Sequence, residues 1–369
     1  MQCSPAIIGI PKRSRFGIMD EDRAYGRALE AAVGCDMIQP ILFGGKLIGW
    51  AKGEQGSARV LHRKAQGEKW WATGFGTYDD LISEITAGGK KYTATFSKSH
   101  TTAGVANNYY DLWPVGGAPA AGLYGGAAHT AVEKDDTTLG SIWSNGNAGG
   151  TDTKHLIRMD AFATANTPTL ILYDRCLTYE ACAYNAAANQ AMTNTATLNR
   201  YEGAGQGGCK ILITAQTVGN ATAANLTQLQ YTDQDGNATQ SMPTTPTVAT
   251  IVSAAAPTAT LGARVVMPAT NAATLPWGPY LPMAAGDGGA RLIANFTTSA
   301  ANTGTLCMIL ARPLAILSLP TAGVTSMVDL VQQIAGLERV RDGACLSLLY
   351  YQPATTANTL NGSFDVACG

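Results

Sequence analysis

Charged side chains are scarce in this sequence. Only 14% of its 369 residues are Asp, Glu, Lys or Arg, against about 25% in ordinary soluble domains, and the formal net charge is −1. A nearly neutral chain exerts no general attraction on nucleic acid or on an anionic membrane, so we expect neither as a partner. A surface with so little charge is typical of a protein that other subunits cover, although Thr and Asn can also keep a surface hydrated.

The motifs of common metal, nucleotide and hydrolase sites are missing as well. The eight cysteines form no CxxC pair and none lies close to one of the four histidines, which excludes the usual zinc spacing. The Gly-Gly-Lys at 44–46 lacks the upstream glycine and the Ser or Thr of a phosphate-binding loop. No GxSxG nucleophile motif occurs. We therefore predict no catalytic, cofactor-binding or metal-binding residues.

One acidic stretch begins like a calcium-binding loop. Asp233, Asp235 and Asn237 stand at alternate positions, but no Glu closes the loop and the flanking residues are strand-like. We expect Asp235 and Gly236 to form a hairpin turn instead.

Neither a secretory signal nor a membrane span is indicated. In the opening residues, MQCSPAIIGIPKRSRFG, the basic side chains follow the short apolar run, which reverses the order of a secretory signal. The longest apolar stretch, 306–320, is short for a membrane span and contains Arg312 and Pro313. We interpret it as two core strands joined at a bend. These features favour assembly in a reducing cytoplasm, with mostly buried free thiols.

The chain falls into two unlike halves. Residues 1–165 hold most of the charged residues and every tryptophan except Trp277, and we predict a mixed α+β region there that serves for docking or as an arm. Apolar spacing and terminal glycines predict helices at 20–34 and 77–89. Gly44-Gly45 predicts a hairpin.

Two stretches of this first half are candidate contact surfaces. Residues 103–153 are rich in Gly and Ala with aromatics spaced between them, which favours an ordered arm lying on a neighbouring subunit over a set of surface loops. Residues 58–71 place basic side chains beside two tryptophans, which either grip a partner or face water. The candidate partner contacts are Arg59, Arg63, Lys64, Lys69, Trp70, Trp71, Tyr109, Tyr110 and Trp113.

Residues 166–369 are predicted to be a β-sandwich, with a jelly roll as one form. Short apolar or alternating runs, bounded by Gly, Asn, Asp or Pro, recur at the spacing of antiparallel sandwiches. Helical spacing of apolar residues predicts one helix at 325–340. The fold class is therefore mainly β. The predicted strands are 167–179, 207–218, 224–242, 263–268, 288–299, 304–317 and 345–353.

A five-residue motif occurs twice, as AGQGG at 204–208 and AGDGG at 285–289. Each copy precedes a strand, a small polar turn and a second strand. A phosphate-binding loop would require a helix after the glycines. We interpret the pair as an architectural unit used twice, each copy forming an edge loop and a hairpin with glycines at positive φ.

The segments LILYDRCLTYEAC and LPMAAGDGGARLIANFTTSAANTGTLCMILARPLAIL, with the strands between them, resemble virion structural proteins of tailed bacteriophages. The resemblance covers residues 155–369 well and the first half loosely. It implies a noncatalytic head decoration, or cement, subunit located in the virion and assembled in the host cytoplasm. It also implies a homo-oligomer, expected to be a trimer, that binds the major capsid protein or other virion subunits.

Three alternatives stay open. A tail or adsorption subunit would use exposed Tyr and Trp rings to stack on sugars. The length also suits a major capsid protein, but the long charged N-terminal helix often expected there is missing. A polysaccharide hydrolase would need a carboxylate pair in a cleft, whereas the second half has few acids and most are at turn positions.

Overall fold

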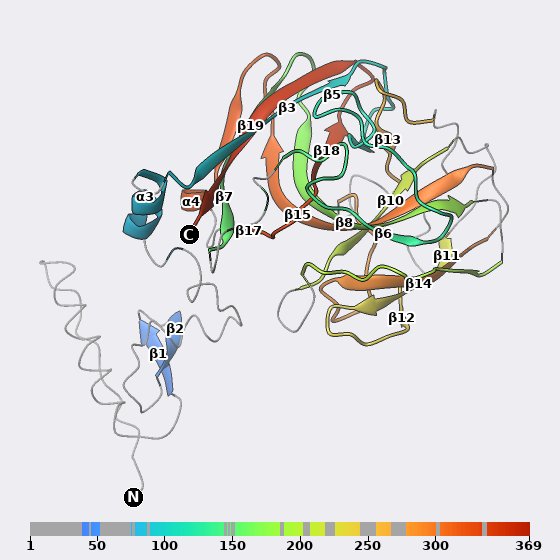
Figure 1. Ribbon diagram of the computed structural model, residues 1–369, viewed down its shortest axis with the longest axis horizontal. Coiled ribbons are helices and arrows are strands. Elements are labelled where there is room, and N and C mark those ends of the chain that lie inside the picture. Colours follow the sequence, from blue (N-terminus) through green and yellow to red (C-terminus); the bar gives the residue numbers. More distant parts are fainter. Residues whose placement is uncertain are drawn as a thin grey trace, which may run out of the picture. The chain divides into compact units, whose positions relative to one another are not determined.

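Two long antiparallel strands form the centre of the fold. They are β8 (Thr169–Ala183) and β15 (Thr305–Ser318), which pair along their whole length in the computed structural model (Figure 1). Both were predicted as strands from their apolar runs. The structure describes residues 39–43, 46–51, 75, 78–86, 89–143, 146, 148, 152–184, 188–201, 207–217, 226–243, 256–266, 278–299, 303–333 and 338–369.

The chain divides into two compact units, Met1–Ala72 and Thr73–Gly369. In the first unit, β1 (Gln39–Phe43) and β2 (Lys46–Ala51) are antiparallel neighbours, which confirms the predicted hairpin. The predicted helix at 20–34 lies outside the described residues. The boundary predicted from the sequence was at residue 165, whereas this division lies at residue 72, and strands that precede residue 165 are hydrogen-bonded to strands that follow it.

The central sheet is built on these two long strands and closes on itself. Val265, which directly follows the last strand, bridges to Thr214 in the first, and the amide of Val266 donates to the Ile213 carbonyl at 2.8 Å. The strands run in the order β10 (Lys210–Ala215), β15, β8, β18 (Leu346–Gln352), β4 (Asn108–Asp111) and β13 (Ala263–Arg264), with β6 (Ala131–Glu133) also beside β8.

A second sheet covers one half of the long strands. Leu172 of β8 and Leu317 of β15 pack there against Met159 and Phe364 in one core. The sheet runs in the order β16 (Ser326–Asp329), β7 (Lys154–Ala163), β19 (Asn358–Cys368), β3 (Lys91–His100) and β5 (Gly117–Ala118), with β17 (Arg339–Val340) also beside β7.

A third sheet covers the other half of the long strands. Leu177 of β8 and Met308 of β15 pack there against Ile293 and Phe296. The sheet runs in the order β12 (Gln240–Ser241), β11 (Leu226–Asp233), β14 (Ala290–Thr298) and β9 (Gln190–Ala191).

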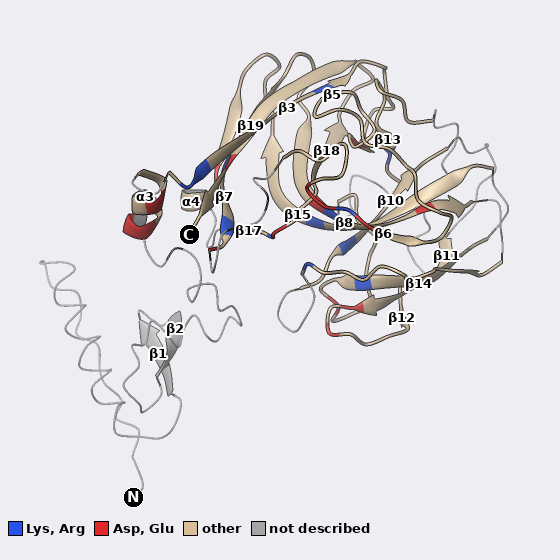
Figure 2. Ribbon diagram, viewed as in Figure 1, with Lys and Arg blue, Asp and Glu red and all other residues tan. Residues whose placement is uncertain are grey.

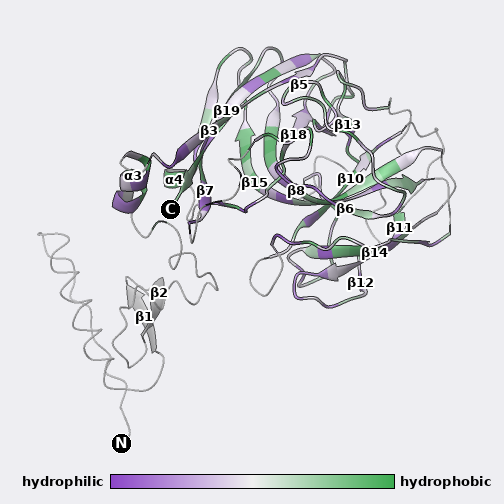
Figure 3. Cartoon of the chain, viewed as in Figure 1, coloured by the Kyte–Doolittle hydropathy of each residue, from purple (hydrophilic) through white to green (hydrophobic). Residues whose placement is uncertain are grey.

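β8 and β15 are covered on one face by two sheets and on the other by the interior of the closed sheet, so both contain apolar runs (green in Figure 3), which Asp174, Arg175 and Glu180 interrupt in β8 and Arg312 in β15. The fold is mainly β, with antiparallel sheets packed as in a β-sandwich, as predicted.

The repeated glycine motif has an architectural role, but its strands pair differently from the prediction. The two strands of one copy do not form a hairpin. The first strand of each copy pairs with the second strand of the other, β10 with β15 and β14 with β11. Each copy therefore contributes one strand to the central sheet and one to the third sheet.

The two copies also meet each other. Cys209 and Ala290, which directly follow the paired glycines, form an antiparallel bridge with N···O distances of 3.0 and 2.7 Å. The side chain of Gln234, after β11, accepts hydrogen bonds from the amides of Gly288 and Gly289 at 3.0 and 3.1 Å. The glycines thus provide the close backbone approach at which the central and third sheets join.

Two further predictions concern the helices of the second unit. The helix predicted at 77–89 is confirmed as α3 (Tyr78–Thr86), whose Leu81 packs with Ile157 and Ala367. The helix predicted at 325–340 is wrong at both ends, where the structure has β16 and β17. The four residues of α4 (Leu330–Gln333) are helical, and residues 334–337 lie outside the described residues.

Other predictions are refined. The apolar stretch 306–320 is one strand with an irregular register at Pro313–Ala315, rather than two strands joined at a bend. The predicted turn at Asp235–Gly236 is confirmed between β11 and β12, with Gly236 at φ 91°. Six described cysteines are free and buried, as expected.

The contact between the glycine motifs predicts a sharp difference between two neighbouring glycines. A Cβ at Gly289 would stand 2.2 Å from the Gly207 carbonyl oxygen, whereas at Gly288 the nearest atom is 3.7 Å away. We expect Gly289→Ala to lower the free energy of unfolding by about 1–3 kcal/mol, and Gly288→Ala to change it by less than about 0.5 kcal/mol. Urea unfolding of both variants measures this, and equal effects would contradict the close approach.

Candidate functional site

Ten charged side chains of the second unit are buried. Figure 2 shows few coloured residues on the strands, and several of them are buried. Charges this deep must be paired or hydrogen-bonded, since an isolated buried ion is strongly disfavoured. The buried charged residues are Lys98, Asp111, Lys134, Lys154, Asp174, Arg175, Glu180, Arg200, Asp233 and Asp365.

One ion pair occupies the interior of the closed central sheet. Arg175 of β8 donates to a carboxylate oxygen of Asp111 of β4 at 2.6 Å, and neither side chain is exposed. The other oxygen of Asp111 accepts from the Tyr173 hydroxyl at 2.8 Å and from the backbone amide of Trp113 at 3.0 Å. The guanidinium carbon of Arg175 lies 4.9 Å from the ring centre of Trp113 and 5.9 Å from that of Tyr124.

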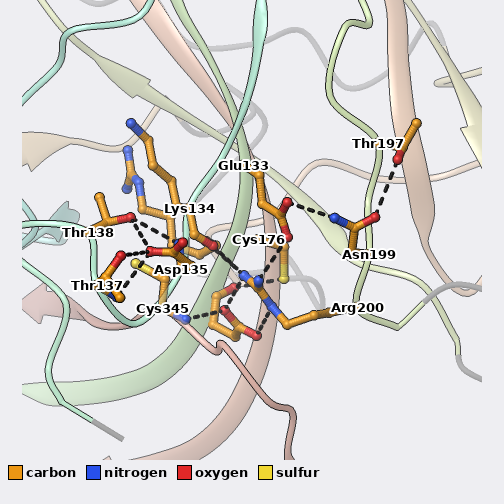
Figure 4. A network of polar contacts seen from close by, with 12 residues as sticks. Glu133, Lys134, Asp135, Thr137, Thr138, Cys176, Thr197, Asn199, Arg200 and Cys345 are labelled. Carbon is orange, nitrogen blue, oxygen red and sulfur yellow. Dashed lines mark hydrogen bonds and ion pairs between the residues drawn. The ribbon is translucent and has the colours of Figure 1, made fainter. Parts of the chain in front are cut away.

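A second network holds the opposite side of β8 (Figure 4). Arg200 donates from Nε and Nη2 to the two oxygens of Asp174 at 2.9 and 3.1 Å. Its Nη2 also donates to the Lys134 carbonyl at 2.6 Å, and its Nη1 lies 3.3 Å from Glu133. The amide of Cys345 adds a bond to Asp174 at 2.9 Å. This network ties β6, β8 and the start of β18 together.

A third buried pair links β8 to the residue that follows β6. Glu180 of β8 lies 2.9 Å from the amine of Lys134 and accepts from the amide of Gly126 at 2.6 Å. Burial alone would raise the pKa of Glu180, but the hydrogen bond from Gly126 and the pairing with Lys134 bring it below its ordinary value. Glu180 is therefore held as a carboxylate.

The chemistry of these buried networks suits a structural role. Both Asp111 and Asp174 are occupied by a guanidinium and by backbone amides, so neither has a free oxygen directed to a substrate. Within the described residues, no group of three or more His, Cys, Asp or Glu could hold a metal ion. No helix in the same part of the chain is long and apolar enough to cross a membrane.

The predicted contact residues are placed as follows. Arg59, Arg63, Lys64, Lys69, Trp70 and Trp71 lie outside the described residues. Tyr109 is half-buried beside Tyr351, with ring centres 5.0 Å apart, whereas Tyr110 and Trp113 are buried within the chain itself.

The expectation that 103–153 is an arm on a neighbour is therefore corrected for its first part. Residues 108–111 are β4 of the central sheet, and Trp113 packs against Arg175. The physical cause is that Tyr110 and Trp113 are buried within their own unit, so they need no neighbouring subunit to cover them.

Large apolar side chains that the sequence analysis missed are exposed instead. Ile316 is 61% exposed and Met327 is 57% exposed, with Val324 between them along the chain. Met327 belongs to β16, the outermost strand of its sheet among the described residues. Residues 318–328 carry no charge at all, and this feature of the sequence could have pointed to the exposed apolar side chains. We call residues 316–327 the apolar segment.

A buried histidine lies apart from these networks. His100 of β3 is fully buried, with its ring 5.0 Å from the ring centres of both Tyr110 and Tyr350. Neither ring nitrogen has a hydrogen-bond partner. Burial lowers the pKa of His100 from 6.5 to about 4.

The buried ion pair predicts a large cost for removing one partner. Arg175→Met leaves Asp111 charged inside the closed sheet, so we expect the free energy of unfolding to fall by about 3–5 kcal/mol. A control is Arg158→Met, whose side chain is 43% exposed and pairs with the partly exposed Asp160. Because Lys91 still pairs with the other neighbour of Arg158, Asp365, this change should cost at most about 1 kcal/mol. Urea unfolding decides, and a small effect of Arg175→Met would show that Asp111 is not held as a buried ion.

The buried histidine predicts a pH dependence. The unfolded chain binds a proton at His100 near pH 6.5 and the folded chain only near pH 4, so stability conferred by the neutral ring is complete above pH 6.5 and is lost as pH falls toward 4. Between pH 7.5 and 4, the wild type should lose about 3 kcal/mol more than His100→Phe. Parallel urea curves at the two pH values measure the difference, and identical losses would contradict the prediction.

Comparison with known proteins gives no family. No protein-family model matches the chain, and no curated protein matches it. Among solved structures, the chain is similar to the VP2 subviral particle of infectious bursal disease virus, at 10% identity and a TM-score of 0.16, over 75% of this chain and 80% of that one. It is also similar to a mutant VP2 of the same virus, at 9% identity and 0.17, over 78% and 83%. TM-scores this low transfer neither a fold nor a function.

Proposed function

We propose that the chain is a noncatalytic structural subunit of a virus particle, and more specifically a head decoration protein that binds the capsid shell and its own copies. The single observation that carries the proposal is the distribution of charge and apolar surface. Ten charged side chains of the described residues are buried, among them the Arg175–Asp111 and Arg200–Asp174 pairs, while some large apolar side chains, such as Ile316 and Met327, are exposed. A surface of this kind suits contact with other subunits more than turnover of a substrate.

The apolar segment is the first candidate for such a contact. A strand at the edge of a sheet exposes unpaired backbone groups, and soluble proteins usually protect it with Lys, Pro or inward charges. The apolar segment instead exposes Met327 in the edge strand β16 and Val324 just before it. A neighbouring subunit would cover these side chains and form hydrogen bonds with the unpaired backbone groups of the edge strand.

The outer face of the second sheet offers a further neutral surface. Hydroxyl and amide side chains follow β3 and β19 on this face, and charge is confined to one end, where Lys91, Arg158 and Asp160 surround Asp365. Neutral polar side chains can be desolvated in a contact at less cost than ions. The neutral residues are Thr93, Thr95, Ser97, Thr359, Asn361 and Ser363.

The alternative of a tail or adsorption subunit is favoured by one observation. Trp143 is 50% exposed, and its ring lies 6.5 Å from that of Tyr92 in an edge-on arrangement. An exposed Trp beside a Tyr can stack on a sugar ring. Titration of tryptophan fluorescence with oligosaccharides, compared between the wild type and Trp143→Ala, separates this alternative from decoration.

The proposal predicts self-association through the apolar segment. In size-exclusion chromatography with light scattering, the full chain should form a closed oligomer, for which we propose a trimer. Ile316→Lys should weaken this association by about tenfold or more, because the contact would have to bury an unpaired ammonium group.

A control and a binding experiment complete the test. Ile82→Lys, at a side chain 57% exposed on α3, should leave the association unchanged. Co-sedimentation with empty phage shells tests the shell contact directly. A strictly monomeric chain that is not retained by shells would overturn the decoration function.

A further inference from the structure

Two of the buried thiols face each other. The sulfur atoms of Cys176 in β8 and Cys209 before β10 are 3.5 Å apart, with one thiol donating to the other. Their side chains are 1% and 0% exposed. Among the described cysteines, these two have their sulfur atoms within hydrogen-bonding distance of each other.

The pair lies where the sheets of the fold join. Cys176 stands two residues from Asp174, which Arg200 holds in place, and Cys209 forms the backbone bridge to Ala290 between the two glycine motifs. Both side chains belong to the core between the central and third sheets. A covalent bond here would connect β8 directly to the junction of the repeated units.

We infer that Cys176 and Cys209 are a latent disulfide, kept as thiols in a reducing compartment and joined when the protein meets a disulfide oxidant. The sulfur atoms need to approach from 3.5 Å to the roughly 2 Å of a disulfide bond. Small rotations of two short side chains can supply this approach. The inference is independent of the proposed function.

The reaction is balanced with oxidised glutathione as the oxidant. One protein thiolate attacks a glutathione sulfur, giving a mixed disulfide and one glutathione thiol. The second protein thiolate then attacks the protein sulfur of that mixed disulfide and releases the second glutathione. The two cysteines lose two electrons and two protons, which the two glutathione molecules take up.

The surroundings make the reaction slow until the chain opens locally. Tyr201 is buried beside the pair, and the guanidinium carbons of Arg312 and Arg341 lie 5.5 and 5.6 Å from its ring centre. Burial, together with the hydrogen bond to Cys209 and the nearby Asp174, raises the pKa of the Cys176 thiol well above its ordinary value. Since the thiolate is the reacting species, oxidation requires transient opening of this region.

The test is to oxidise the full, reduced chain with oxidised glutathione, in buffer and in urea below the unfolding transition. Intact mass should fall by two hydrogens, and peptide mapping without reductant should identify one cross-linked peptide that contains Cys176 and Cys209. The bond spans 33 residues of sequence, so the oxidised protein should melt several degrees higher than the reduced protein.

Matched variants separate the pair from other thiols. Cys209→Ser should abolish both the cross-link and the rise in melting temperature, whereas Cys345→Ser, at an equally buried cysteine, should leave both in place. The peptide map of the wild type decides even if a variant fails to fold. Free thiols at both positions after oxidation in urea, stable glutathione adducts, or bonds to other cysteines would overturn the inference.

Discussion

The pairing of β8 with β15 is the constraint on which the rest of the structure depends. The two strands are bonded over twelve residue pairs and contribute side chains to three cores at once. A slip of one residue would turn every side chain of a strand to the opposite face. It would move Leu172 and Leu177 into the closed sheet and expel Tyr173 and Arg175 from it. Register is therefore fixed far more strongly here than in a strand with one solvent face.

The buried ions fit this need for a unique register. Neighbouring residues of β8 point in opposite directions, so Asp174 meets Arg200 on one face while Arg175 meets Asp111 on the other. Buried ion pairs add little net stability compared with apolar packing, because desolvation offsets their attraction. They do penalise any arrangement that leaves one partner alone. Together they make the alternative registers of β8 strongly unfavourable.

The sequence predicts the second-half strands well because their burial leaves continuous apolar runs between turn residues. Strands β3 and β19 were missed because polar residues stand at their buried positions. In β3 these are Lys98 and His100, and in β19 they include Asn358. A buried Lys98 is possible because its amine donates to the carbonyls of Val115 and Pro119 at 3.0 and 2.9 Å, which depends on a loop that the local pattern cannot reveal.

Pairing with a distant strand also determined the secondary structure at the start of the segment 325–340. Its apolar spacing suits a helix, yet Ser326–Asp329 pair with Arg158–Ala161 of β7, and this pairing directs Val328 to the core and Met327 to solvent.

The glycine motifs and the candidate site also depend on long-range pairing that the local sequence does not reveal. Sequence similarity revealed a unit used twice, but the exchange of strands between copies is a long-range property. The buried acids likewise gave no signal of their partners, since Asp111 and Arg175 are 64 residues apart.

The low charge content and the burial of ten charged side chains have the same physical consequence for the surface, which carries few charges. A chain with few ions can present a neutral exterior only if a good share of those ions lies inside, and ten charged residues are buried in the described part. Each of the paired ions then contributes to specificity of folding and is removed from the surface. The exterior that remains offers hydroxyl groups, amides and isolated large apolar side chains beside the remaining charges. A surface with so little net charge exerts weak long-range attraction, so the subunit contacts proposed above would depend on shape and apolar contact.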